Sequence, residues 1–410
     1  MRIEDQVAQL GPGPLTEEGL REHVWPLFSR TLSSVQEIYL ANHSLGRPLD
    51  QMAEDVRQAL DAWYDRMDGA WDPWFAAVGE YRSMIAQMIG LSEASGVVPK
   101  TSAGQGLRAV LNSFDQPIRV LATAGEFDSI DHILKVYEAK GRVQVTWIEP
   151  ELSDVGVPWI EPEKVLEAIQ PGLDLVIVSR VYFSTGQALS QIDEMTQRAH
   201  SVGALILVDT YHAAGVLPLA MESEGIDFMI GGCYKYLRGG PGACWLAIHP
   251  SILDSGRRTL DTGWFAKKNP FSYARPEPVE FGERGDSWLE STAPVITQFQ
   301  ALAGLRLTLA LGIDRLRAYN LAQQDFLRQC LDEVQVPSIK PVNPDDFGAF
   351  ALVPADDAMG FAAELRRHGV NTDARGRTVR FGPDVLTTRD ELKRAAQRTA
   401  QVFASRLQKA

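Results

Sequence analysis

Cysteine is scarce in this chain, and its scarcity excludes two kinds of structure. The 410 residues include three cysteines, at positions 233, 244 and 330, and no two of them are spaced as paired metal ligands are. A disulfide framework or a zinc site would need more cysteines in closer pairs. We therefore expect free thiols and no bound metal.

Long apolar and long basic segments are also missing. No stretch approaches the roughly eighteen consecutive apolar residues of a membrane helix. The N-terminus, MRIEDQVAQLGPGPLTEEGL, carries acids and no apolar centre, unlike a signal peptide. No run of Lys or Arg suggests a nucleic-acid surface, and the formal net charge is −13. These features predict a cytoplasmic protein with no nucleic-acid partner and no membrane partner.

Apolar runs alternate with helical patterns through the middle of the chain. With 45% hydrophobic and 23% charged residues, the chain can bury a large core or two domains. The alternation predicts an α/β fold around a mostly parallel sheet, in which only the last two strands pair antiparallel. The predicted strands are 118–122, 143–148, 173–178, 204–209, 228–231 and 243–248, and the predicted helices are 129–140, 162–169 and 192–202.

The pattern changes after about residue 293. A long helical region, 293–334 with a break near Gly312, leads to strand 347–353, helix 358–367, strand 378–381 and helix 389–408. This predicts a second, smaller α+β domain. We expect three parts: an N-terminal arm (1–48) that packs with the small domain, a large α/β domain (49–292) and the small C-terminal domain (293–410).

Lys235 is the most informative residue, because of its relation to Asp209. The lysine lies in GGCYKYLRGGPGACWLAI, and Asp209 ends the apolar run ALILVDTYHAAG twenty-six residues earlier. A lysine amine can form a Schiff base with the aldehyde of pyridoxal phosphate (PLP), and an aspartate can keep the pyridine nitrogen protonated. A single lysine beside glycines is most often a surface residue. Paired with the strand-end aspartate, it predicts a PLP enzyme in which Lys235 and Asp209 are catalytic and bind the cofactor.

Other segments at strand ends could complete a PLP site. Ser102, Ala103 and Gly104 begin a predicted helix, where backbone N–H groups could bind the phosphate; an ordinary capped helix is the alternative. Phe127 follows a strand and could stack on the ring, although an aromatic there is more often part of the core. Thr185, after another strand, could contact the rim of the cofactor.

At these residues the chain resembles kynureninase-like enzymes of the fold-type I, PLP-dependent aminotransferase class V group. The resemblance implies that Tyr234 is catalytic and binds the cofactor phosphate, and that His212 lies near the cofactor 3-oxygen. It also implies a homodimer in which Trp264 and Thr292 reach the partner's cofactor; for Trp264 the alternative is a core aromatic. The matching motifs are YLANHSLGRP, VYFSTGQ, VDTYHAAG, GIDF, YKYL, GWF, STAP and DARGRTVRFGP.

The implied activity is hydrolytic Cβ–Cγ cleavage of L-kynurenine or a related γ-keto amino acid to alanine and an aromatic acid. Arg380 stands where the family binds the substrate carboxylate, with Arg375 and Arg377 as alternatives. His43 and Ser44 of NHSLG are expected near the substrate. His43 replaces the family's usual asparagine, Phe183–Ser184 replaces a tyrosine pair, and STAP replaces Ser–Asn–Pro–Pro. A class V aminotransferase or lyase that acts on another amino acid is therefore the alternative.

Two further classes are less consistent with the sequence. A cysteine desulfurase needs a mobile nucleophilic cysteine, whereas Cys330 occupies an apolar helical position that predicts a buried thiol. A binding module without catalysis would not need both Lys235 and Asp209. An aromatic group in the N-terminal third could line a substrate pocket, but such groups more often form core or interface. Its members are Trp63, Tyr64, Trp71, Trp74 and Phe75.

Overall fold

The computed structural model describes residues 2–154 and 156–407, and its largest sheet has seven strands in the order β2-β10-β9-β8-β7-β3-β4. The strands from β9 to β4 are parallel, while β10 runs antiparallel to β9 and to β2. The parallel strands and the antiparallel β9–β10 pair confirm the prediction, whereas the antiparallel β10–β2 pair was not expected. The edge strand β2 was not predicted, because it is short and contains Pro99, which an edge strand tolerates. The strands are β2 (Val97–Lys100), β3 (Ile118–Thr123), β4 (Val143–Ile148), β7 (Leu175–Ser179), β8 (Leu205–Asp209), β9 (Phe228–Gly232) and β10 (Cys244–Ile248).

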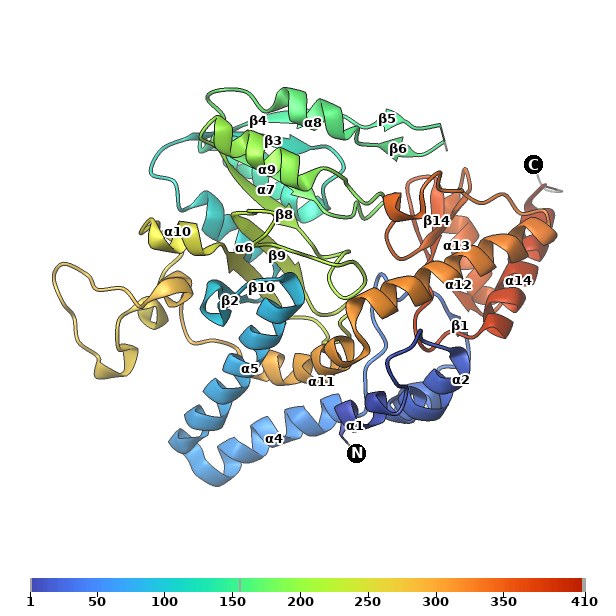
Figure 1. Cartoon of the computed structure of the whole chain (residues 1–410), viewed down its shortest axis with the longest axis horizontal. Coiled ribbons are helices and arrows are strands. Elements are labelled where there is room, and N and C mark those ends of the chain that lie inside the picture. Colours follow the sequence, from blue (N-terminus) through green and yellow to red (C-terminus); the bar gives the residue numbers. More distant parts are fainter. Residues whose placement is uncertain (1, 155, 408–410) are drawn as a thin grey trace.

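Helices cover both faces of this sheet (Figure 1). On one face α6, α7 and α10 share an apolar cluster with the strands, and on the other face α5, α8, α9 and α11 do so. A parallel sheet that is buried on both faces needs continuously apolar strands, which explains the runs LVIVS in β7 and LILVD in β8. The helices are α5 (Trp71–Ile89), α6 (Ala103–Leu111), α7 (Asp128–Ala139), α8 (Pro162–Ala168), α9 (Ile192–Ser201), α10 (Pro250–Asp254) and α11 (Val295–Leu311).

The helix α12 (Ile313–Glu333) connects the sheet to a C-terminal unit (Figure 1). It meets α11 at Gly312, whose φ of +84° favours glycine, so the predicted break is confirmed. Within the described part of the chain, no single helix is long and apolar enough to cross a membrane; α11 and α12 pass that test only as a pair bent by 84°.

The C-terminal unit contains an antiparallel sheet of order β11-β14-β13. Its apolar residues, with Leu327 and Leu331 of α12, form a separate core cluster. The first strand begins at Ala351 rather than at residue 347, and β13 was not predicted because it has three residues. Gln408, the predicted end of the last helix, lies outside the described residues. The elements are β11 (Ala351–Pro354), α13 (Ala358–Arg367), β12 (Val370–Asn371), β13 (Asp373–Arg375), β14 (Thr378–Phe381) and α14 (Arg389–Leu407).

The N-terminal segment lies against both of these units. Its strand β1 (Ile38–Tyr39) pairs in parallel with β12. Leu20 and Phe28 share an apolar cluster with Leu307 of α11 and with Val385. The helices of this region are α1 (Ile3–Ala8), α2 (Glu17–Gly19), α3 (Ser29–Ser34) and α4 (Gln51–Arg66). The domain boundaries at residues 48 and 292 stay a proposal.

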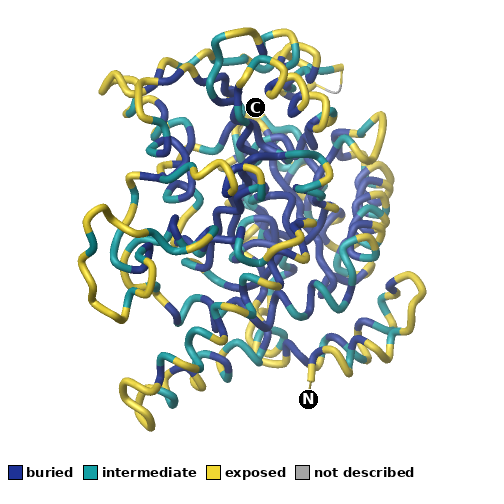
Figure 2. The backbone as a smooth tube through the Cα atoms, turned by 60° about the vertical axis from the view of Figure 1, so that its left-hand side comes forward, coloured by how far each residue is buried: buried dark blue, intermediate teal, exposed yellow. Residues whose placement is uncertain are grey.

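Figure 2 shows that buried residues concentrate in the middle of the molecule, whereas the segments that project from it are largely exposed.

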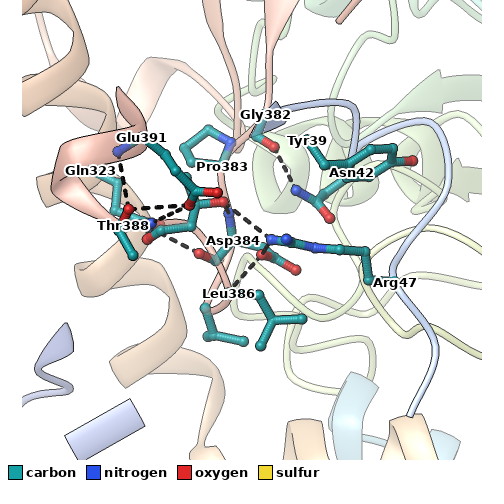
Figure 3. Close-up of polar contacts among 12 residues, drawn as sticks. Tyr39, Asn42, Arg47, Gln323, Gly382, Pro383, Asp384, Leu386, Thr388 and Glu391 are labelled. Carbon is teal, nitrogen blue, oxygen red and sulfur yellow. Dashed lines mark hydrogen bonds and ion pairs between the residues drawn. The ribbon is translucent and has the colours of Figure 1, made fainter. Parts of the chain in front are cut away.

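Asp384 joins three parts of the chain at one buried point (Figure 3). Its carboxylate pairs with Arg47 of the N-terminal segment and, at 3.2 Å, with Arg238 of the loop after β9. The N–H of Leu386 donates to the same carboxylate at 2.9 Å, and the Gln323 amide donates to the Asp384 carbonyl at 3.0 Å. Burial would raise the pKa of Asp384, but the two guanidinium groups lower it below its ordinary value. The ionised carboxylate therefore balances two buried cations.

We predict that Asp384→Asn lowers the free energy of unfolding by about 3–5 kcal/mol, because it leaves buried guanidinium groups without a counter-charge. Urea denaturation measures the change. Asp356→Asn is the matched control, since Asp356 pairs with Arg377 where both side chains are exposed, and exposed pairs contribute little. If Asp384→Asn unfolds at the same urea concentration as the control, Asp384 does not hold the three parts together.

Candidate active site

Polar side chains gather at the carboxyl-terminal edge of the parallel strands. Ser179 ends β7, Asp209 ends β8, and the two residues are register partners. Lys235 lies in the loop between β9 and β10. This edge is where α/β sheets bind ligands. The three residues line a cavity of about 210 Å³ together with Thr101, Ser102, Ala103, Gly104, Phe127, Ser129, Ile130, Val181, Phe183, Tyr211, His212, Tyr234, Pro241, Gly242 and Cys244.

Lys235 is buried, and its amine faces aromatic rings. The Nζ atom lies 4.7 Å from the ring centroid of Tyr211 and 5.7 Å from those of Phe127 and Tyr234. Burial lowers the pKa of Lys235 to about 7, although the charge of Asp209 opposes this shift. A large fraction of the amine is therefore uncharged near neutral pH and able to attack an aldehyde.

Asp209 presents a buried carboxylate to the same cavity. One of its oxygens accepts the N–H of Tyr211 at 2.7 Å. Burial raises the pKa of Asp209, whereas this hydrogen bond and the charge of Lys235 lower it. A protonated ring nitrogen against the carboxylate would stabilise the ionised form further, as any close opposite charge does.

The loop that carries Lys235 is fixed by the N-terminal segment. The N–H of Gly46 donates to the Tyr234 carbonyl at 2.8 Å, and the N–H of Arg238 donates to the Lys235 carbonyl at 3.0 Å. A Cβ on Gly46 would lie 1.9 Å from the Lys235 carbonyl oxygen, so this approach requires glycine. The glycine of NHSLG therefore has a packing role next to the lysine.

The start of α6 forms the end of the cavity predicted to hold the phosphate. Ser102 caps the helix by accepting the N–H of Gln105 at 3.1 Å, as the alternative interpretation of this segment also expected. Ala103 and Gly104 follow in the first turn and line the cavity. The N–H groups of a first helical turn have no partner within the helix and attract anions. Capping and phosphate binding are thus compatible here.

These residues fit PLP. Lys235 offers the amine for its aldehyde, Asp209 the carboxylate for its ring nitrogen, and α6 the N–H groups for its phosphate. Phe127 lines the cavity and offers a ring face. The Nδ1 atom of His212 is buried and makes no hydrogen bond to any residue that the structure describes. Such a group calls for a partner, and a polar atom of the cofactor would supply one.

Arg380, predicted to bind the substrate carboxylate, is buried outside this lining and is already paired. Its Nε donates to an Asp373 carboxylate oxygen at 2.7 Å, its Nη2 donates to the other oxygen, and its Nη1 donates to the Phe183 carbonyl. His43, at 2.6 Å, and Ser44 contact the same carboxylate. Burial alone would raise the pKa of Asp373, but His43 and Arg380 lower it well below its ordinary value. The three predicted residues therefore converge on an aspartate that was not predicted.

Three other predicted residues lie apart from the cavity. The indole N–H of half-buried Trp264 donates to the Thr292 hydroxyl at 3.2 Å. Thr185 lines a separate groove of about 740 Å³ with Arg375 and Arg377, the two alternative arginines. The cofactor roles of Trp264, Thr292 and Thr185 stay proposals.

The aromatic group of the N-terminal third forms a surface cluster and does not line the cavity. The ring of Trp71 lies 5.3 Å from those of Trp74 and Phe75 and 5.8 Å from that of Phe271. The hairpin of α4 and α5 projects from the body of the molecule (Figure 1). The Trp71 ring connects this hairpin to the loop after α10. Trp63 remains 54% exposed and Tyr64 80% exposed. These residues therefore do not form the substrate pocket that was considered for them at the cavity.

Several residues of the site were not predicted. Ser179 ends a strand beside Asp209, so the reasoning that found the aspartate could have found the serine. Tyr211 follows Asp209, but nothing in the sequence indicates that its ring faces the lysine. Cys244, expected only to be a free thiol, is buried and also lines the cavity, with its sulfur 3.3 Å from the Tyr211 hydroxyl. Its position depends on the antiparallel pairing of β10.

Fold and cavity together define an α/β enzyme site that is built for PLP. Residues 73–365 match the model of the aminotransferase class V family, so the chain belongs to this family. The family is PLP-dependent, and PLP is the cofactor of this enzyme.

Known proteins with similar sequences or structures agree with this assignment. The kynureninase of Xanthomonas campestris pv. campestris (strain B100) is 27% identical over 360 residues, which cover 83% of this chain and 80% of the relative. The kynureninase of Shouchella clausii (strain KSM-K16) is 23% identical over 366 residues, 85% of this chain and 84% of the relative. The apo cysteine desulfurase of Thermococcus onnurineus NA1 superposes with a TM-score of 0.78 at 18% identity, covering 94% of this chain and 98% of its own. The cystine C–S lyase C-DES gives 0.79 at 17% identity, covering 90% and 98%. The predicted fold-type I architecture is confirmed.

We predict that PLP is attached to Lys235. Purified protein should be yellow, and borohydride should abolish the visible absorbance and leave a pyridoxyl mass on the Lys235 peptide, because reduction fixes a Schiff base. Lys235→Ala should fold but lose both the reducible band and turnover. Lys164→Ala, which alters an exposed lysine paired with Glu151, should retain them. Colourless protein that does not respond to added PLP would show the assignment to be wrong.

Proposed function

We propose that this enzyme hydrolyses the Cβ–Cγ bond of L-kynurenine or a related γ-keto amino acid and releases alanine and an aromatic acid. The observation that carries the proposal is the similarity to kynureninases over more than four fifths of the chain. The residues of the motifs that suggested it, Asp209, His212, Tyr234 and Lys235, line one cavity.

Arg380 is the proposed site for the substrate α-carboxylate, because a guanidinium group binds a carboxylate bidentately. Asp373 occupies the Nε–Nη2 edge and the Phe183 carbonyl accepts from Nη1, so a substrate carboxylate must displace Asp373 or share Nη1 with Phe183. Burial, followed by the charge of Arg380, lowers the pKa of His43 to about 4. His43 is thus uncharged near neutral pH and can hydrogen-bond the substrate without repelling Arg380.

Lys235 is the proposed proton carrier. Bound PLP supplies the electron sink for the carbanion that forms at the substrate Cα. Lys235 would be the general base that removes the Cα proton, a role that its lowered pKa suits near neutral pH. Asp209 holds the proton on the ring nitrogen. After water adds to the γ-carbonyl and the Cβ–Cγ bond breaks, Lys235 can return a proton to the alanine fragment.

A class V aminotransferase or lyase that acts on another amino acid is the second candidate. It is favoured by His43 and Phe183, which differ from the kynureninase pattern near the proposed substrate site. A desulfurase is less favoured, because Cys233, Cys244 and Cys330 are all buried. Burial also raises the pKa of each of these thiols, which disfavours the reactive thiolate.

We further propose a homodimer with composite active sites, and we retain the cytoplasm as its compartment. Trp264 and Thr292 lie outside the cavity of their own chain, on a region that also exposes Leu260 (71%) and Tyr273 (72%). An exposed apolar surface of this kind is typical of a protein interface, and twofold dimers are the commonest assemblies.

We predict turnover of L-kynurenine or 3-hydroxykynurenine to alanine and anthranilate or its hydroxy derivative. Liquid chromatography with mass detection follows the products formed from both compounds. The same assay is run with cysteine, aspartate and alanine, each supplied together with keto acids. Arg380→Lys should raise KM more than it lowers kcat, because an ammonium group cannot replace the bidentate contact. Amino-group transfer to pyruvate or 2-oxoglutarate without carbon–carbon cleavage would favour the aminotransferase instead.

We predict that mixing inactive Lys235→Ala and Thr292→Ala proteins restores part of the activity. Mixed dimers would contain one cavity with both native residues, if Thr292 acts on the partner's cofactor. Light scattering should give the mass of a dimer. Thr297→Ala, which removes a hydroxyl bonded within its own chain to the Pro294 carbonyl, should stay active alone. A fully active monomer at assay concentration would rule out shared sites.

A further inference from the structure

A second buried carboxyl group lies behind the wall of the cavity, and the proposed mechanism does not use it. Glu126 follows β3 and is 4% exposed. One of its oxygens accepts the Thr123 hydroxyl at 2.7 Å, and the other lies 2.6 Å from the Ser179 hydroxyl oxygen. Across the described ranges Glu126 forms no ion pair with a basic side chain. A carboxylate so enclosed would have two hydroxyl groups and the backbone N–H of Ser179 to balance its charge.

Ser179 connects this carboxyl group to the cofactor cavity. It lines the cavity, as Phe127 does, whereas Glu126 does not. It is also the register partner of Asp209. A serine hydroxyl has one hydrogen to donate. That hydrogen can point to Glu126 or toward Asp209 and the bound cofactor, but not to both.

The surroundings of Glu126 favour its protonated form. Burial raises the pKa of Glu126 to about 8, the hydrogen bonds from Ser179 and Thr123 oppose the shift, and the charge of Asp209 adds to it. The other titratable group that faces it is the buried phenol of Tyr182, whose pKa burial raises well above its ordinary value. The groups of the described chain that face Glu126 therefore include no cation. They come from β3, β7 and β8 and from the loop after β7.

We propose that Glu126 is a positioning residue for the ring-nitrogen end of the cavity. In its protonated form it donates to Ser179, and Ser179 then donates toward Asp209 and the cofactor. When Glu126 ionises, Ser179 must donate back to it, and the contact on the cavity side is lost. The inference rests on PLP binding and not on the identity of the substrate.

The experiment is a titration of apoprotein with PLP, followed by tryptophan fluorescence, at pH values below and above 8. The dissociation constant of the wild type should rise about tenfold through this range, the size expected for one lost hydrogen bond to a charged group. Glu126→Gln should lack this rise in the dissociation constant, because an amide donates to Ser179 at every pH. Lys235 and Asp209 titrate in both proteins, so the difference between the two profiles reports Glu126.

Two further variants separate positioning from simple packing. Thr123→Val removes the hydroxyl that donates to the other oxygen of Glu126. Thr123 does not line the cavity. Because that hydrogen bond lowers the pKa of Glu126, the break in the binding profile should move to higher pH. Ser179→Ala should remove the break, and adding Glu126→Gln to it should have no further effect.

The outcomes decide the proposal even if one variant folds poorly. The proposal would be supported by an infrared band of a protonated carboxyl group that the wild type shows below pH 8 and loses above pH 8. Glu126→Gln should not show this band. Superimposable wild-type and Glu126→Gln binding profiles would overturn it, as would an unmoved break in Thr123→Val. Failure to cleave kynurenine would leave these profiles unchanged, so it would count against the proposed substrate alone.

Discussion

The structure depends on keeping an amine and a carboxylate out of bulk water at the same small site. Burial lowers the pKa of Lys235 and raises that of Asp209; the charge of Asp209 opposes the first shift, and the Tyr211 N–H followed by the charge of Lys235 opposes the second. Neighbouring parallel strands bring the two together, because β8 ends at Asp209 and β9 leads into the lysine loop. The position of this loop is then set from outside the sheet by Gly46 and by the Asp384 pair with Arg238.

The parts that the sequence predicts are those encoded by local patterns. Apolar runs gave six of the seven strands of the large sheet, and β2 was missed because Pro99 interrupts its pattern. The predicted cofactor residues that follow strand ends or start a helix line the cavity, whereas Thr185, Trp264 and Thr292 do not. The substrate side was not: Asp373 meets His43 across 330 positions of sequence, and no periodicity encodes such a contact. The partners of Trp264 and the orientation of the Tyr211 ring likewise depend on how distant loops fold together.

Two layers of polar groups surround the cofactor end of the cavity. Asp209, His212 and Lys235 face the cavity directly. Ser179 also lines the cavity and connects to Glu126 behind it, and the capped start of α6 connects through Gln105 to Glu290, which also pairs with the buried Lys100. Each of these outer groups restricts the orientation of a group that faces the cavity. Precise placement of this kind limits the reorganisation needed during reaction.

Under the proposed function, in which Arg380 binds the substrate carboxylate, the Asp373–Arg380 pair bears on the choice of substrate. A buried guanidinium group without a partner is costly, and Asp373 supplies the partner before a substrate arrives. A substrate carboxylate therefore gains only the difference between its own contacts and those that Asp373 already makes. Discrimination must then come from the rest of the substrate. The ring of Phe350 lies 4.8 Å from the His43 ring and 5.3 Å from the Arg380 guanidinium carbon, and Phe183 lines the adjacent cavity. Because aromatic rings pack favourably against such faces, these surroundings suit an aromatic side chain better than a short polar one.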